Sequence, residues 1–364
     1  GREGLFINLQ ALSVGLLGHS AFALRLVSAI FGILTVLGLY FFTREYVGNE
    51  RIALLAAFLL ATSFWHINFS RIGFRAIMAP FFLVVGFGFF YYVWNRRRSK
   101  RHIHILFAAL LGGIFFGLGF HSYIAYRAAP ILLLPLLWLF YKDAGRHRES
   151  CTLCIPAIFL FGILLAVLPL LFFFGQHPDL FFGRTSQISI FSEPDPLKLF
   201  WTNIGKTVGM LYLAGDFNWR HNWAGEPALW WPVAIFFTLG ILMAIRRRYA
   251  VIILWLSAMI LPVVISSERI PHALRSIIII PPIFVLAALG LDFIWRRSTG
   301  WLKRMETEVP EAAIIIRRIQ KLTYLLVLGI LFGISVRTFN LYFQSWAIRP
   351  EVAVAFQADL TKGH

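Results

Sequence analysis

The sequence contains few cysteines and few acidic residues, and charged residues of all kinds make up only 14% of its 364 positions. Soluble globular proteins carry about 25% charged residues. The two cysteines, Cys151 and Cys154, cannot form a disulfide-rich scaffold, and no second ligand pair lies near this C-x-x-C to complete a zinc site. We therefore expect them to be two small residues tolerated in an apolar setting.

Hydrophobic residues make up 59% of the chain and occur in continuous runs, many close to the ~20 residues that a bilayer core requires. This pattern excludes a soluble enzyme and predicts an all-α polytopic membrane protein with about ten transmembrane helices. The predicted spans are residues 22–42, 52–69, 76–94, 105–120, 123–141, 152–174, 228–245, 250–265, 276–293 and 324–343.

The chain has 34 Lys and Arg against 17 Asp and Glu. In a soluble protein this excess would suggest nucleic acid, but in a membrane protein it sets orientation, so we expect no nucleic-acid partner. One alternating set of loops holds 20 basic residues, and the short loops of the opposite set hold five. The positive-inside rule then places residue 1, residues 175–227 and the C-terminus outside.

This orientation predicts a transmembrane domain over residues 1–343, with outer loops 1–20 and 175–227 forming the site region. Residues 344–364 would begin a further outer segment. Because the chain starts at Gly1 rather than Met, we expect it to begin within a longer protein.

In two outer segments, apolar residues recur at the spacing that places them on one side of a helix. Asp195 can cap a helix that has Pro196 at its first position, and residues 5–16 carry leucines along one side. Each helix either lies on the membrane surface or packs on the bundle. On the inner side, residues 311–322 have Ile-rich and Arg-rich faces, which predicts a surface linker.

Polar residues at a membrane are functional candidates by default, and the outer ones are mostly basic. The planar guanidinium group of arginine can donate two hydrogen bonds to one phosphate, so we expect these residues to bind a lipid phosphate. The alternative is that each arginine reaches lipid headgroups or pairs with a carboxylate. The candidate phosphate-binding residues are Arg71, Arg75, Arg127, Arg220 and Arg275.

Carboxylates are scarce on the outer side, which limits the choice of a general base. The main candidates are Glu3, Asp216, Glu226 and Glu268. Glu3 precedes the first amphipathic helix, where it either faces a lipid-linked substrate or simply complements the helix dipole. Residues 215–222 combine an acid, amides, a cation, an imidazole and aromatics, which suits a sugar ring or a self-bonded turn.

Several short segments resemble the GT-C membrane glycosyltransferases, in the branch that contains protein O-mannosyltransferases and the aminoarabinose transferase of lipid A. Residues 3–13, followed by Ala23-Leu24-Arg25-Leu26, resemble the first outer loop and second helix of that family. Residues 61–75, Gly215-Asp216 with Arg220-His221-Asn222, and Pro271-His272-Ala273-Leu274-Arg275 are also similar. Each motif is short, and their order along the chain is the more specific signal.

The resemblance implies inverting transfer from a polyprenyl-phosphate-sugar to an acceptor hydroxyl of a protein, lipid or glycan. It also implies an outer-face site in a membrane, which we expect to be a prokaryotic plasma membrane. The family has an acidic pair in its first outer loop, in which an aspartate acts as base. Here Glu3 is what remains at that position, and the usual first span is missing. No cofactor is required on chemical grounds, and metal dependence stays open.

The predicted site residues fall into three groups. Glu3 and Asp216 are the catalytic candidates, and the five arginines named above bind the donor phosphate. Substrate-binding candidates are Asn8, His66, Asn218, His221, Asn222 and His272.

The alternative function is a transporter or flippase of an anionic lipid-linked substrate. Translocation requires ionisable or discontinuous elements at mid-bilayer, whereas chemistry on one side requires them at one end. Residues 54–60, 83–90 and 160–168, at the span centres, contain no charge, which favours the transferase.

Overall fold

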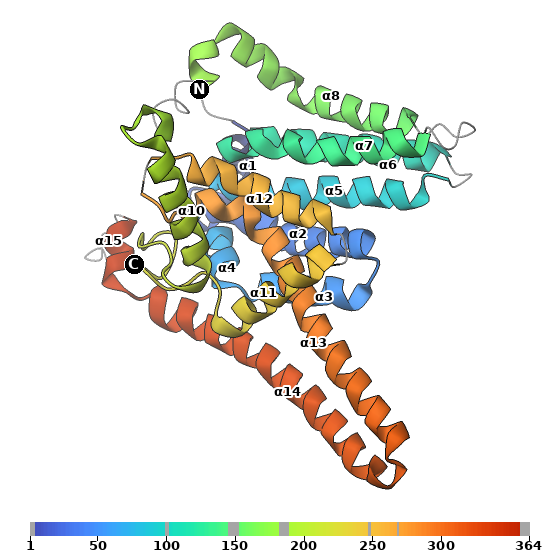
Figure 1. Cartoon of the computed structure of the whole chain (residues 1–364). Coiled ribbons are helices and arrows are strands. Elements are labelled where there is room, and N and C mark those ends of the chain that lie inside the picture. Colours follow the sequence, from blue (N-terminus) through green and yellow to red (C-terminus); the bar gives the residue numbers. More distant parts are fainter. Residues whose placement is uncertain are drawn as a thin grey trace.

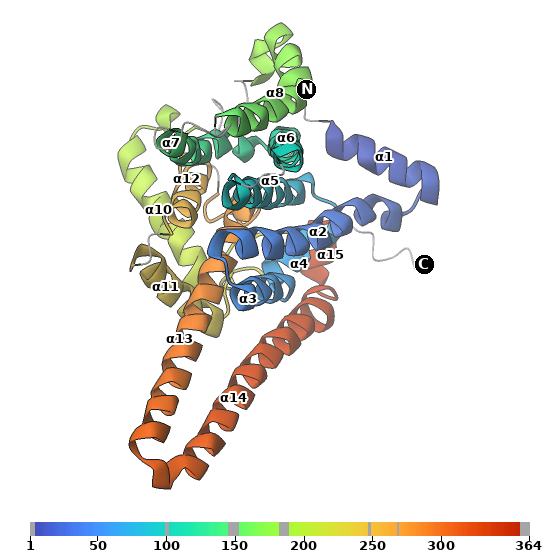
Figure 2. The same cartoon turned by 90° about the vertical axis from the view of Figure 1, so that its right-hand side faces the viewer.

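The computed structural model describes residues 4–98, 102–144, 153–181, 189–246, 249–267 and 269–356, and these are helical almost throughout (Figures 1 and 2). Seven described helices are long and apolar enough to cross a membrane, or eight when one bent pair is counted as a span. The predicted all-α polytopic class is confirmed, while the predicted count of ten spans is not.

Four long helices lie side by side on one flank of the bundle (Figure 1). They are α2 (Ala21–Val47), α5 (Met78–Arg96), α6 (His102–Leu118) and α8 (Cys154–Gln176). The side chain of Ser20 caps α2 by accepting a hydrogen bond from the Ala23 N–H, and Gly48 ends the helix at a φ of 70°. Cys154, at the start of α8, is disulfide-bonded, a role beyond that of the small residue in an apolar setting that we expected. Cys151 lies outside the described residues.

Short helical turns join these long helices on the outer side. The 3-10 segments are η1 (Arg75–Ile77), η2 (Gly119–His121) and η3 (Ile124–Leu132), and η3 leads into α7 (Leu133–Ala144). The predicted span 123–141 is therefore a 3-10 segment followed by an α-helix.

The predicted span 52–69 is broken into α3 (Glu50–Ala61) and α4 (Phe64–Arg71), which meet at a 60° bend. The break falls where Ser63 adopts an extended backbone, with a φ of −85° and a ψ of 128°. The bend turns the short helix α4 toward the outer loops, where it contributes to the site described below.

The C-terminal half contains two short apolar helices and two long ones. The helices α11 (Trp231–Arg246) and α12 (Ala250–Val264) have 16 and 15 residues, which is short for a span. After η5 (Arg275–Ile279), α13 (Ile280–Glu308) runs to η6 (Pro310–Ala312) and turns back as α14 (Ala313–Phe339). The linker predicted at 311–322 is wrong, because most of it forms the first turns of α14.

Beyond α14 the chain continues as a π-helical segment, η7 (Asn340–Trp346), and a short helix, α15 (Pro350–Ala355). In the outer stretch, η4 (Ile190–Ser192) precedes α10 (Pro196–Tyr212). An isolated antiparallel bridge joins Ser189 to Ser266.

The two outer amphipathic helices pack on the bundle through polar side chains. In α10, Asp195 accepts a hydrogen bond from the Lys198 N–H at 3.1 Å, which confirms the predicted cap. Buried Asn203 donates to the carbonyls of Val264 and Ser266, whereas Trp201 is 66% exposed. In α1 (Leu5–Leu17), buried Ser13 donates to the Ala23 carbonyl. Many apolar side chains of each helix therefore face away from the bundle.

Close backbone approach holds α11 against α13. A Cβ added at Gly240 would overlap the carbonyl oxygen of Leu286, and one at Gly290 would overlap that of Phe236. Small residues of this kind allow membrane helices to pack at short range.

We predict that Gly290→Leu lowers the melting temperature of the purified protein in detergent, because the obstructing atom is backbone and cannot move aside. Overpacking of this kind costs about 1–3 kcal/mol or more. The matched control is Gly329→Leu in α14, where an added Cβ meets no atom within 4 Å. Equal melting temperatures for the two variants would contradict the packing described for α11 and α13.

Candidate functional site

The candidate site is formed by two loops that are far apart in sequence. The first, residues 213–227, follows α10 and closes on itself: the Gly215 N–H donates to the Gly225 carbonyl at 3.0 Å, and the Gly225 N–H donates to the Asp216 carbonyl at 3.1 Å. Gly225 allows this closure at a φ of 81°. The second loop, residues 269–274, leads into η5.

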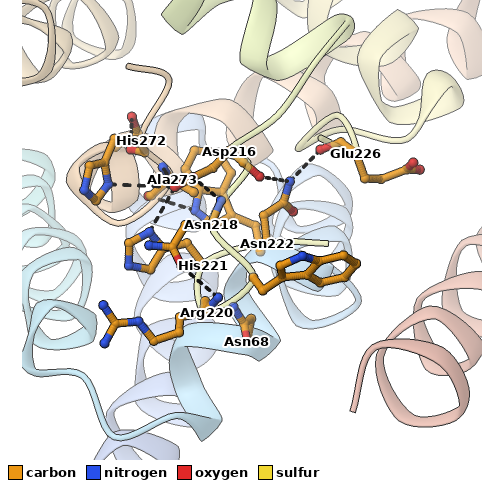
Figure 3. Close-up of polar contacts among 12 residues, drawn as sticks. Asn68, Asp216, Asn218, Arg220, His221, Asn222, Glu226, His272 and Ala273 are labelled. Carbon is orange, nitrogen blue, oxygen red and sulfur yellow. Dashed lines mark hydrogen bonds and ion pairs between the residues drawn. The ribbon is translucent and has the colours of Figure 1, made fainter. Parts of the chain in front are cut away.

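The Asp216 carboxylate joins the two loops (Figure 3). Its Oδ1 accepts a hydrogen bond from the Asn218 N–H at 2.8 Å. Its Oδ2 lies 3.0 Å from His221 Nδ1 and accepts from the Ala273 N–H at 2.8 Å. Because an ionised carboxylate only accepts, Nδ1 is the donor in the contact with His221.

A second histidine lies against this pair. The rings of His221 and His272 are stacked with centroids 4.8 Å apart, and His272 Nδ1 is 3.8 Å from Asp216 Oδ2. That nitrogen is buried and has no hydrogen-bond partner. The site therefore contains one carboxylate and two imidazoles in contact.

The environment favours an ionised carboxylate beside a neutral His272. Burial disfavours the charge on Asp216, but hydrogen bonds from His221, Asn218 and Ala273 outweigh it and hold its pKa below the usual value. Burial, with the electrostatic influence of the neighbouring His221 and Arg275, lowers the pKa of His272 to about 4.

Helix α4 holds the first loop in place through side-chain contacts. Asn68 donates to the Arg220 carbonyl at 3.0 Å, and the Phe69 ring lies 5.9 Å from that of His221. Trp65, on the same helix, donates to the Ala273 carbonyl at 3.1 Å in the second loop. The bend between α3 and α4 therefore places one short helix in contact with both loops.

The two loops enclose a cavity of about 530 Å³. Its polar lining includes two cations, Arg220 and Arg269, beside the two histidines and Asp216. The Arg220 side chain is exposed and points away from the hydrogen-bonded cluster (Figure 3).

The other four predicted phosphate-binding arginines do not line this cavity. Arg71 lines a separate cavity of about 670 Å³ together with Arg25, and its guanidinium lies 5.0 Å from the Phe343 ring. Arg127 donates to the Phe181 carbonyl at 2.8 Å, Arg275 donates to Ser266, and Arg75 lies half-buried in η1. The structure thus distributes the predicted phosphate-binding residues over several places.

The remaining predicted residues are also dispersed. His66 is buried in α4, with its Nε2 3.1 Å from the Gly32 carbonyl, and Asn8 lies on α1. Asn222 holds the first loop closed by donating to the carbonyls of Asp216 and Glu226. Glu226 itself pairs with Arg337, while Glu3 and Glu268 lie outside the described residues. Asp216, Asn218, Arg220, His221 and His272 are the predicted residues that line the cavity.

Sequence reasoning missed two contributors to the cavity and its support. Arg269 lines the cavity, although it was not among the predicted site residues. Trp346, in the π-helical segment, donates to the Trp219 carbonyl at 3.0 Å and so fastens the first loop to the end of α14. No local pattern signals such a long-range contact, although an aromatic residue at a membrane boundary is a general hint.

Among the described residues, the carboxylate and the two imidazoles of the site could together hold a metal ion. Asp216, His221 and His272 each offer one ligand atom, and these atoms lie within 4.8 Å of one another. Nitrogen and oxygen ligands suit zinc, but three ligands leave a fourth position to be filled.

The fold has counterparts among solved membrane proteins. The archaeal oligosaccharyltransferase AglB from Archaeoglobus fulgidus, in complex with an inhibitory peptide and a dolichol-phosphate, is 16% identical, with a TM-score of 0.55. ArnT from Cupriavidus metallidurans, bound to undecaprenyl phosphate, is 16% identical, with a TM-score of 0.54. The matches cover 92% and 98% of this chain. The chain therefore has the fold of GT-C membrane glycosyltransferases.

A family model adds to this likeness: residues 5–173 match the family described as dolichyl-phosphate-mannose-protein mannosyltransferase. The predicted resemblance to this family is confirmed over residues 5–173, a little under half of the chain. The chain spans 47% of the length of the oligosaccharyltransferase and 64% of that of ArnT. No curated protein matches the sequence.

We predict that acidification destabilises the protein through His272. Its pKa of about 4 lies below the ordinary 6.5, so the unfolded chain binds the proton first as the pH falls. The free energy of unfolding should therefore fall by about 3 kcal/mol between pH 7 and pH 4. The lowered pKa of Asp216 adds a loss of the same sign at more acidic pH.

The measurement is the melting temperature in detergent across this pH range. His272→Gln, which does not titrate, should show a shallower decline than the unmodified protein, and exposed His19→Gln should not. If the slope for His272→Gln equalled that of the unmodified protein, His272 would not be a buried neutral imidazole.

Proposed function

We propose that this protein transfers a sugar from a polyprenyl-phosphate-linked donor to an acceptor hydroxyl, with inversion at the anomeric carbon. The family match over residues 5–173 and the likeness in fold to ArnT support this class of reaction. The observation that carries the proposal is the cavity formed by the two loops. There an ionised carboxylate and two imidazoles lie in contact, and two arginines share the lining of the cavity with them, in a chain whose predicted span centres carry no charge.

The chemistry requires a base and a stabilised leaving group. The acceptor oxygen attacks the anomeric carbon, the bond from that carbon to the phosphate oxygen breaks, and the acceptor proton passes to the base. A positioned base contributes about 10²- to 10⁴-fold in rate. The phosphate leaves with its charge, which preplaced cations stabilise.

We assign the base to the pair formed by Asp216 and His221. Both Asp216 oxygens already accept hydrogen bonds, and Asp216 Oδ2 holds His221 through Nδ1. Because Nδ1 carries the proton that it donates to Asp216, His221 Nε2 keeps its lone pair. The His221 ring lines the cavity, so Nε2 is the atom that takes the acceptor proton. Glu3, the residue that the family resemblance places in the first outer loop, is the second candidate base.

We assign the donor phosphate to Arg220 and Arg269, because these two cations share the cavity with the base. Arg71 and Arg25 form the neighbouring cationic cavity and come second for this role. Asn218, His272 and the aromatic side chains of the first loop would contact the sugar. The acceptor is a hydroxyl of a protein, lipid or glycan on the outer face, and the membrane is a prokaryotic plasma membrane.

The test is to incubate the full chain in micelles with undecaprenyl-phosphate-linked sugars and a membrane extract as the source of acceptors. We predict release of undecaprenyl phosphate, reduced about 10²-fold or more by Asp216→Asn and by His221→Gln. Arg220→Ala should weaken donor binding and turnover, because it removes a cation from the cavity. Glu3→Gln, assayed in parallel, shows which acid is required.

The matched control is Lys206→Ala, on an exposed position of α10 outside the cavity. It should leave release unchanged. Full activity in both Asp216→Asn and His221→Gln would reject the assigned base. A transporter would instead move the intact donor across liposome membranes without release of undecaprenyl phosphate, and that result would reject the transferase.

A further inference from the structure

The hairpin of α13 and α14 leaves the side of the bundle close to its basic end (Figures 1 and 2). Asp292 marks that end, because it pairs with Arg51 at the start of α3 at 3.6 Å and with Arg296 at 2.6 Å. From Asp292, α13 continues to Glu308, which corresponds to about 24 Å of helix. The hairpin leans away from the other helices in both views (Figures 1 and 2).

The two arms of the hairpin are joined to each other. Arg317 Nε donates to Glu306 Oε1 at 2.8 Å, and the rings of Trp295 and Tyr324 meet at 5.9 Å. Leu302 and Ile316 are 3% and 5% exposed. These contacts hold the two arms of the tip together, so one face of each arm is buried and the other is exposed.

One face of the tip is apolar, and no other described part of the chain covers it. Five large side chains remain exposed there: Trp301, Ile314, Ile315, Ile319 and Leu322. Ile315, Ile319 and Leu322 recur at helical spacing along α14, so they form one stripe. Water is a poor solvent for such a stripe, and an apolar partner would stabilise it.

Basic residues flank this stripe. Besides Arg296 and Arg317, which are ion-paired, the exposed ones are Arg297, Lys303, Arg304, Arg318 and Lys321. Over residues 294–323 the chain has seven Lys and Arg against three Asp and Glu, and one of those acids, Glu306, is already paired with Arg317. The surface to which the tip binds should therefore be apolar beneath a layer of negative charge.

We propose that the tip of the α13–α14 hairpin docks on the anionic headgroup surface of the membrane leaflet at the basic end of the bundle. The stripe of Ile315, Ile319 and Leu322 enters the boundary between headgroups and acyl chains. Arg318 and Lys321 contact lipid phosphates. An amphipathic element with a basic rim binds such a surface, and anionic lipid strengthens the attachment.

Charge favours lipid over a second copy of this chain. Two tips facing each other would bring two sets of basic residues together, and like charges repel. An anionic leaflet complements both the apolar stripe and its rim. The docking surface lies at the end of the bundle opposite to the candidate site, so its test is independent of the glycosyltransferase assay.

The test uses the full chain in nanodiscs of phosphatidylcholine alone or of phosphatidylcholine mixed with phosphatidylglycerol. An environment-sensitive dye is attached to Ile315→Cys in a chain that also carries Cys151→Ser and Cys154→Ser. We predict a blue-shifted emission, and about tenfold protection from a water-soluble quencher, in the phosphatidylglycerol discs compared with phosphatidylcholine alone.

Reversal of charge supplies the matched comparison. Arg318→Glu with Lys321→Glu should abolish the response to phosphatidylglycerol, whereas Lys198→Glu with Lys206→Glu, on exposed positions of α10, should preserve it. High salt should weaken the response of the unmodified tip by screening, which tests the charge effect without a change of sequence. A dye at Phe191→Cys, in the outer stretch, should not respond.

Two results would overturn the proposal. One is equal exposure of the dye to the quencher in both lipid compositions. The other is protection that appears in detergent and rises with protein concentration, because that would assign the stripe to contact between copies of the chain.

Discussion

The candidate site depends on how the charge of one buried aspartate is satisfied. Asp216 accepts hydrogen bonds from Asn218 and His221 in its own loop and from the Ala273 N–H in the other loop. A buried carboxylate without partners would be costly, and three donors offset that cost. The two loops are therefore fastened by the same group that gives the cavity its negative charge. Structural support and chemistry are not separable at this residue.

Part of the site was predictable from sequence because it is local. Asp216, Arg220 and His221 lie within one short segment, and His272 belongs to a motif with a family resemblance. Their mutual contact was not predictable, because it depends on how two loops and α4 pack together. The arginines show the same limit. Their placement on the outer side followed from charge patterning, but aromatic rings and backbone carbonyls hold Arg71 and Arg127 away from the cavity.

The fold followed from hydrophobic runs because a bilayer requires long apolar segments. Each of the ten predicted runs contains helix, but length decides which of them can span. Residues 228–245 and 250–265 yield helices of 16 and 15 residues. At 311–322, the Ile-rich and Arg-rich faces suggested a linker. In the structure these residues pair with α13 through Arg317 and Ile316, and tertiary packing extends the helix through them.

Helix α14 and its π-helical extension connect opposite ends of the molecule. The amino-terminal turns of α14 carry the apolar stripe and the basic residues beside it, and Trp346, past its far end, donates to backbone carbonyls at Trp219 and Asn222. One continuous helical segment therefore links the tip of the hairpin to the loop that contains Asp216. A displacement of this segment would reach the rim of the cavity through the hydrogen bonds of Trp346.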